Sequence, residues 1–273
     1  MKTIKTIVKP LLVLAFALAS MSAARAQFWD SSTGLLQAPS ADMNADGTFM
    51  ITNNFINKNA ISKTYWGYHT FMYGFNVSFW SRLEIGYVCV ILNGAWDPRP
   101  EEEKSYRLKI LRNQDRHFVG KLLLLREGDF GIPWLPALAV GFSDPTTGAG
   151  ADYSKTAVGG NGNGFFNRYY VVATKHFATP AGQIGAHLGY QYNRRTDFPM
   201  NGPSAAIDWT PVWTQNKGIL DNMKLILEYD SRTVNMGFIA SIWENRFEAM
   251  FELQNFQWVN FGLRYKLRLK KAN

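Results

Sequence analysis

Four carboxylates in the last quarter of the chain have a spacing that could support acid–base chemistry. Glu228 and Asp230 are two residues apart, and Glu248 and Glu252 follow farther along the chain. In an extended strand, residues two apart share a face and lie about 6.6 Å apart along it. That separation overlaps the range that inverting glycosidases use between their acid and base. Glycoside hydrolysis is therefore one chemistry that these residues could perform.

Basic residues on the last predicted strand favour a different role for these carboxylates. Arg264, Lys266 and Arg268 alternate with apolar residues, so all three share one face. A barrel interior must neutralise its own charges, and nearby cations would lower the carboxyl pKa values and make the acids poor proton donors. We favour a ladder of ion pairs over ligand contacts, and ligand contacts over glycoside chemistry. The predicted site is a lumen charge cluster of Glu228, Asp230, Glu248, Glu252, Arg264, Lys266 and Arg268.

The histidines match no common metal-binding motif. They are His69, His117, His176 and His187, and only the last two, on consecutive predicted strands across a turn at Thr179-Pro180, could approach each other in a lumen. We favour structural or solvated histidines over a catalytic base or a metal pair. The sequence has no nucleophile elbow, P-loop or zinc-protease motif. We expect no catalytic residue, no cofactor and no metal.

Strands that alternate between two faces must position these groups. The alternation is held for eleven residues at the C-terminal end, where Val259, Phe261, Leu263, Tyr265, Leu267 and Leu269 oppose polar residues and a glycine. Segments within 184–192, 223–230, 234–242 and 247–254 repeat this period of two. One face carries large apolar groups and the other carries small or ionisable ones. This partition is typical of a closed barrel with lipid outside and a narrow polar interior.

The N-terminus predicts export. Lys2, Lys5 and Lys9 precede an apolar run, and Ala24-Arg25-Ala26 forms a small-x-small cleavage site, so residues 1–26 are expected to be a secretory signal peptide. Only 18% of the 273 residues are charged, against about 25% in globular proteins. After the signal, no apolar run is long enough for a membrane-spanning helix. The formal charge of +8 includes four basic residues of the signal, so it is weak evidence for an anionic partner.

We predict an all-β fold, a single antiparallel transmembrane barrel of about 12 strands, with 10 to 14 strands compatible. Residues 1–26 are the signal peptide, 27–47 an N-terminal periplasmic lead-in, 48–269 the barrel and 270–273 a C-terminal tail. The longest connections, 94–115 and 144–166, follow odd strands and should be extracellular. The predicted strands are 48–57, 67–79, 82–93, 116–126, 136–143, 167–177, 182–193, 204–212, 222–230, 234–242, 246–254 and 257–269.

Four stretches resemble landmarks of the YjbH-type outer-membrane proteins and occur in the same order. They are GLLQAPSADMNADGTFMI from Gly34, PALAVGFSDPTTGAG from Pro136, YYVVATKH from Tyr169 and KLILEYDSR from Lys224. The resemblance spans residues 34–269. It implies a role in exopolysaccharide and capsule production in Gram-negative bacteria. Better-known members are longer and hold two barrels, so this chain resembles a short, single-barrel form.

We therefore expect a non-enzymatic outer-membrane barrel that assists secretion or assembly of an extracellular polysaccharide or capsule. The alternatives are an outer-membrane enzyme acting on lipid or polysaccharide and a soluble periplasmic β-sandwich. A Ser, a His and an Asn or Asp within hydrogen-bond reach at a barrel rim would favour the enzyme. Expected partners are outer-membrane lipid, an anionic or neutral polysaccharide, and periplasmic or lipoprotein components of an export system. No nucleic acid is expected.

Overall fold

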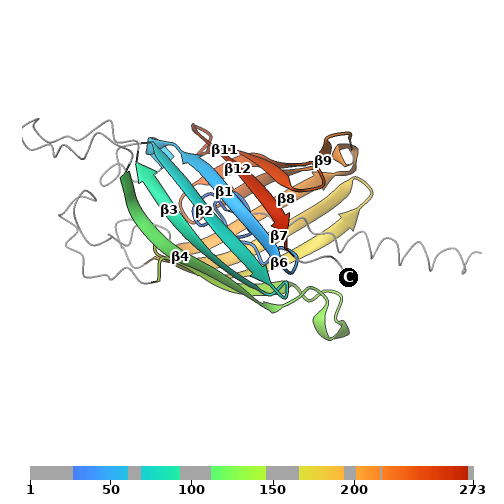
Figure 1. The fold of residues 1–273 in the computed structure, drawn as a ribbon. Coiled ribbons are helices and arrows are strands. Elements are labelled where there is room, and N and C mark those ends of the chain that lie inside the picture. Colours follow the sequence, from blue (N-terminus) through green and yellow to red (C-terminus); the bar gives the residue numbers. More distant parts are fainter. Residues whose placement is uncertain are drawn as a thin grey trace, which may run out of the picture.

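Twelve antiparallel strands form one closed barrel (Figure 1). The computed structural model describes residues 27–60, 69–92, 112–145, 166–193, 201–215 and 217–269. The predicted signal peptide, the C-terminal tail and most of the two long connections lie outside these residues. The strands are β1 Thr48–Ile56, β2 Thr70–Phe79, β3 Leu83–Leu92, β4 Arg112–Leu125, β5 Ala137–Ser143, β6 Arg168–Thr179, β7 Gly182–Tyr192, β8 Gly202–Pro211, β9 Leu220–Tyr229, β10 Val234–Ile242, β11 Phe247–Gln254 and β12 Trp258–Arg268.

Each strand pairs with its neighbours in the sequence, and the last strand pairs with the first. β1 and β12 run side by side from Thr48 opposite Arg268 to Phe55 opposite Phe261. This closure leaves no strand with an unpaired edge, which a lipid environment could not satisfy. The predicted all-β barrel of twelve strands is confirmed, and no predicted strand end is more than four residues from the observed one.

The outer face of the barrel is apolar. On β12, Phe261 is 50% exposed and Leu263 is 62% exposed, whereas Arg264 between Leu263 and Tyr265 is 1% exposed. The same alternation on β7 exposes Leu188 and Tyr190 and buries His187. Large side chains therefore face outward and polar ones face inward, as the period of two predicts.

No helix in the part of the chain that the structure describes has the length and apolarity needed to cross a bilayer.

An N-terminal segment fills the interior of the barrel. Every residue from Gln27 to Asn44 is buried, and we call these residues the inner segment. It is drawn in dark blue in Figure 1, where it loops between the strands. We expected residues 27–47 to be a periplasmic lead-in, and the structure corrects this for 27–44, which the barrel encloses. Polar groups spaced along the segment pair with groups on the wall, so the segment is held inside.

Glycines on the inner face of the wall make room for the inner segment. A Cβ at Gly74 would lie 2.7 Å from Ser31 Oγ, and one at Gly237 would lie 3.0 Å from Leu36 Cδ1. Apolar wall residues complete the contact with the segment. Phe28, Trp29, Leu35 and Leu36 form one core with Met72, Val88, Val90, Val119, Ile226, Ile239 and Met250. The small inward residues thus create space for protein, and the described interior is packed like a domain core.

Candidate functional site

Glu228 on β9 anchors the turn of the inner segment. Its carboxylate accepts hydrogen bonds from three consecutive backbone N–H groups, those of Leu36 (3.1 Å), Gln37 (2.7 Å) and Ala38 (3.2 Å). The Asn235 side-chain amide is 3.4 Å away. A carboxylate that accepts several N–H groups is strongly stabilised by them. Glu228 therefore fixes the position of the inner segment near the C-terminal ends of β9 and β11.

Glu252 on β11 extends this contact. It accepts hydrogen bonds from the Gln37 side-chain amide (2.7 Å) and the Asn260 side-chain amide (2.7 Å). We expected basic partners for the inward acids, but among the described residues neither Glu228 nor Glu252 forms an ion pair. That expectation is wrong for these two residues, because neutral N–H donors of the segment and of wall amides occupy the place of cations.

Glu84 on β3 and Lys121 on β4 hold the inner segment at two places, at Thr33 and near its C-terminal end. They are 3.8 Å apart and their side chains are fully buried. Glu84 accepts the backbone N–H groups of Thr33 (2.9 Å) and Asn44 (3.0 Å). The Lys121 ammonium donates to the carbonyl oxygens of Thr33 and Asp42. The ion pair therefore acts mainly through the backbone of the segment, and the Thr33 hydroxyl adds a side-chain hydrogen bond to Glu84.

Arg168, at the start of β6, adds a second cationic anchor. Its guanidinium forms an ion pair with Asp30 of the inner segment. It also donates to the Gln37 carbonyl oxygen (3.0 Å) and to the Gln191 side chain (3.1 Å). All of these groups are buried. A planar guanidinium suits such a network because its donors have a fixed geometry.

Three of the remaining members of the predicted charge cluster form ion pairs within the wall. Glu248 is 3.2 Å from Arg264 and 2.5 Å from Lys266. Asp230, in the turn after β9, pairs with Arg232 at 2.9 Å. Arg268 was expected in the lumen, but its side chain is exposed because it is the final residue of β12 and lies at the rim.

The ionisation of Asp230 follows from this turn. Burial raises the pKa of its carboxyl, but Arg232 and the backbone N–H groups of Arg232 and Thr233 outweigh burial and lower it overall. Asp230 is therefore an anion that caps a turn, and its hydrogen-bond partners differ from those of Glu228. The predicted cluster thus divides into a wall-paired part and a part that holds the inner segment.

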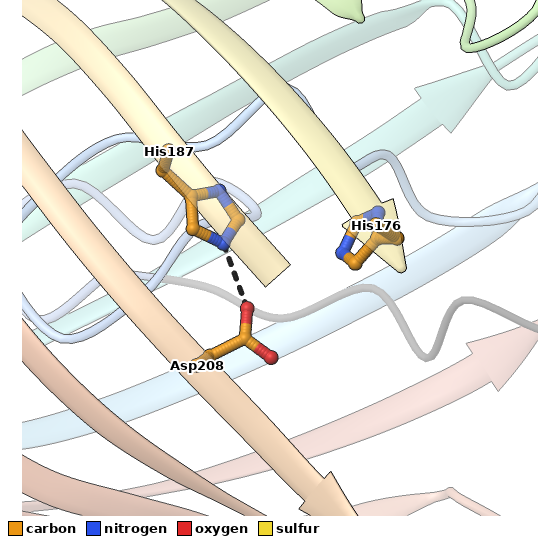
Figure 2. A group of neighbouring side chains, drawn as sticks. All are labelled: His176, His187 and Asp208. Atoms are coloured by element: carbon orange, nitrogen blue, oxygen red, sulfur yellow. Dashed lines mark hydrogen bonds and ion pairs between the residues drawn. The ribbon is translucent and has the colours of Figure 1, made fainter. Parts of the chain in front are cut away.

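A second polar group lies at the other side of the interior, on β6, β7 and β8. His187 Nε2 is 2.7 Å from Asp208 Oδ2, the contact dashed in Figure 2, and His187 Nδ1 is 2.9 Å from Thr174 Oγ1. His176 lies at the end of the neighbouring strand, with its ring centre 5.9 Å from that of His187. The prediction that these two histidines approach each other is confirmed. Donor atoms of His176, His187 and Asp208 lie within 4.8 Å of one another.

Lys224 makes this group a poor metal site. Its ammonium is 3.0 Å from Asp208 and 4.0 Å from Asp42. The carboxylate thus already has a cation beside it, and both His187 nitrogens already have partners. A divalent cation would have to displace Lys224 against charge repulsion. The group is built as an ion-pair network.

The chain of Thr174, His187 and Asp208 has the connectivity of a hydroxyl nucleophile, a base and an orienting acid. Such a nucleophile needs access to a substrate, and Thr174 is only 1% exposed. Its oxygen accepts the backbone N–H of Ala41 in the inner segment at 2.9 Å. The hydroxyl also lies inside the barrel and not at its rim. This arrangement can seat the segment, but it cannot reach a substrate while the segment is in place.

Sequence reasoning missed the residues of the inner segment and their partners Glu84, Lys121 and Arg168. One signal was available. Ile226 and Met250 interrupt polar residues on the inner face, and apolar side chains have no role in a water-filled lumen. These residues indicate that the lumen holds protein.

One protein family matches most of this chain. The family model described as "Exopolysaccharide biosynthesis protein YbjH" matches residues 30–270. None of the curated proteins matches the chain. Among solved structures, the KdgM porin is 9% identical, with 82% of this chain and 99% of that chain covered and a TM-score of 0.43. Wzi, an outer-membrane protein of Escherichia coli described as involved in group 1 capsule assembly, is 11% identical, with 82% and 56% covered and a TM-score of 0.30.

The family match includes most of the inner segment and all twelve strands. The first stretch that resembles the family, residues 34–51, thus begins within the inner segment, and its Leu36 and Asn44 contact Glu228 and Glu84. The chain belongs to the YjbH family of exopolysaccharide biosynthesis proteins.

Proposed function

We propose that this chain is a non-enzymatic barrel of the outer membrane that assists the secretion or assembly of an extracellular polysaccharide. The observation that carries the proposal is that the polar groups of the barrel interior bind the inner segment. The inner segment forms hydrogen bonds with five polar residues of the wall, Glu84, Lys121, Arg168, Glu228 and Glu252. A site built for chemistry would keep a nucleophile or an acid free for its substrate.

Membership of an exopolysaccharide family supplies the substrate class. The apolar outer face supports a location in the outer membrane, because exposed residues such as Leu188 and Leu263 suit lipid and not water. The partners that fit such a role are outer-membrane lipid, an anionic or neutral polysaccharide, and periplasmic or lipoprotein components of an export system.

The enzyme alternative predicts that one side chain is indispensable. Thr174, His187 and Asp208 are its best candidates, because they alone among the described residues form a hydroxyl–imidazole–carboxylate chain. If they only seat the inner segment, then replacing one hydroxyl removes one hydrogen bond, worth about 0.5–1.5 kcal/mol. The barrel would tolerate that loss.

The test measures extracellular polysaccharide in a strain that lacks the gene and carries plasmid-borne variants. Deletion should abolish or strongly reduce polysaccharide output, and the wild-type gene should restore it. Thr174→Val and His187→Gln should each restore output to within a few-fold of wild type, provided that the heat-modifiable barrel band on a gel is present. Leu188→Ile, on the outer face of the same strand as His187, is the matched control. A loss by orders of magnitude from Thr174→Val with the barrel folded would establish the enzyme in its place.

A further inference from the structure

We propose that the inner segment is a displaceable plug and that the wall it covers binds an uncharged, hydroxyl-rich chain when the segment leaves. The identity of that chain as a polysaccharide rests on the proposed function, but the plug itself does not. The proposal follows from the bonding of residues 27–44, from the charges of the wall, and from the way the segment is held.

The inner segment can leave without breaking the barrel. Its backbone-to-backbone hydrogen bonds are internal and join Gln27 to Ser32, Phe28 to Leu36 and Leu35 to Ala38. Among the described residues, no backbone-to-backbone hydrogen bond joins residues 27–44 to a strand. The strands meanwhile close into a ring through the pairing of β1 with β12. The segment is thus an insert held by side chains, and its departure leaves every sheet hydrogen bond intact.

The wall carries two acids that are costly in a permanently dry interior. Glu228 and Glu252 are 2% and 0% exposed, and in the described structure their partners are neutral N–H donors. A buried carboxylate without a counter-ion carries a large desolvation penalty. Water or hydroxyl groups could replace the N–H donors one for one. These acids are therefore explained by a lumen that is wet in another state.

The exposed wall would favour an uncharged chain. Departure of the segment removes Asp30 and Asp42, so that Arg168 loses its ion-pair partner, while Glu84 keeps Lys121 as its partner. Glu228 and Glu252 lose the donors that Gln37 supplies. The vacated surface presents both acceptors and donors, with neither sign in large excess. A hydroxyl group both donates and accepts, so a neutral polyol chain can satisfy each of these groups. A polyanion would meet Glu228 and Glu252.

Apolar contacts keep the plug in place at rest. Leu36 lies in the notch that Gly237 leaves in β10, and Phe28 lies against Gly262 of β12. Both side chains are fully buried. Leu36 therefore controls the balance between the two states without belonging to the wall, and shortening it should favour the open state.

A disulfide can lock the plug. The hydroxyl oxygens of Ser31 in the segment and Thr52 in β1 are in direct contact. Ser31→Cys with Thr52→Cys, in a Cys89→Ser background, joins the segment to the wall. The matched control is Ile51→Cys with Phe75→Cys, a pair of register partners that face outward and link β1 to β2 only. All variants also carry Leu36→Ala, and the current through single barrels is recorded in planar lipid bilayers.

The expected result is intermittent ion current from reduced Leu36→Ala protein, with open time at least tenfold above wild type. Oxidation should reduce the open time of the Ser31→Cys/Thr52→Cys variant at least tenfold, and a reducing agent should restore its current. The control pair should show no change in open time. Short neutral dextran oligomers added to the chamber should interrupt the open current, whereas an anionic oligomer of the same length should do so less.

Three results would overturn parts of the proposal. If neither Leu36→Ala nor Gln37→Ala conducts while each retains the heat-modifiable barrel band, the plug is permanent. If current flows and responds to the disulfide but dextran has no effect, the binding claim is wrong. If the lock works in bilayers but deletion of the gene leaves polysaccharide output unchanged, the proposed function fails and the plug stands.

Discussion

Glu248 and Glu252 lie on one face of β11, four residues apart, and are held in opposite ways. Glu248 contacts the cations Arg264 and Lys266 of the adjacent strand. Glu252 contacts the amides of Gln37 and Asn260 and resembles Glu228 in lacking a cationic partner among the described residues. Cations of the wall thus neutralise Glu248, whereas an amide of the inner segment contacts Glu252 four residues farther along the strand. The difference shows that a lumenal acid takes its role from what lies opposite, and not from its place in the strand pattern.

The strongest way to break this comparison is to neutralise one acid of each kind. Glu248→Gln leaves Arg264 and Lys266 buried beside a neutral amide, and loss of one partner of a buried ion pair costs about 3–5 kcal/mol. Glu228→Gln removes a buried charge that has no counter-ion and retains a carbonyl acceptor, so the loss should stay below about 1.5 kcal/mol. Urea unfolding of the barrel in lipid vesicles measures both values. Equal losses would mean that the inner segment does not substitute for a cation at Glu228.

A comparison of neighbouring residues on β12 sharpens the contrast between the two faces. Leu263→Arg places a charge in the lipid, where it costs about 2–4 kcal/mol near the bilayer midplane. Arg264→Leu removes one of two cations at Glu248 and keeps Lys266, so its loss should be below about 2 kcal/mol. The fraction of heat-resistant folded barrel on a gel should fall far more for the first change. Similar losses would contradict the assignment of the two faces.

The smallest expected effect concerns an ion pair outside the barrel interior. Arg246 and Glu244 are 3.1 Å apart in the turn after β10, close to the Glu248–Arg264 distance, but their side chains are 48% and 73% exposed. Exposed pairs contribute at most about 1 kcal/mol and often nothing measurable. Arg246→Ala should therefore change the urea midpoint by less than the error of the Glu248→Gln measurement. A comparable loss would show that burial does not distinguish these pairs.

The sequence predicted the wall well because the wall depends on local periodicity. The alternation around Leu263 and Arg264 is visible within a few residues. It predicts both that the segment is a strand and which of its residues face outward. Arg268 was placed incorrectly because the same alternation continues to the end of β12, where Arg268 still pairs with Thr48 of β1 but lies beyond the pairing with β11, which ends at Tyr265. At that rim its side chain is exposed.

The candidate site was predicted only in part because its decisive contacts are remote in sequence. Glu228 was correctly placed on the inner face, but its partners Leu36 and Gln37 precede it by 192 and 191 residues. No period or spacing connects such positions. Gln27 to Asn44 shows neither alternation nor a helical pattern, so its position depends on packing against glycines and acids of the completed wall.

The long range of these contacts has a consequence for the order of folding. Gln37 meets Glu252 across 215 residues, so the contacts of the inner segment are complete only when nearly the last strand is present. Such non-local closure is slow compared with the pairing of adjacent hairpins. The inner segment lies just ahead of β1, the strand that also forms the seam with β12. Filling of the barrel by residues 27–44 and closure of the seam therefore both depend on the last strands, and both are completed in the final stage of assembly.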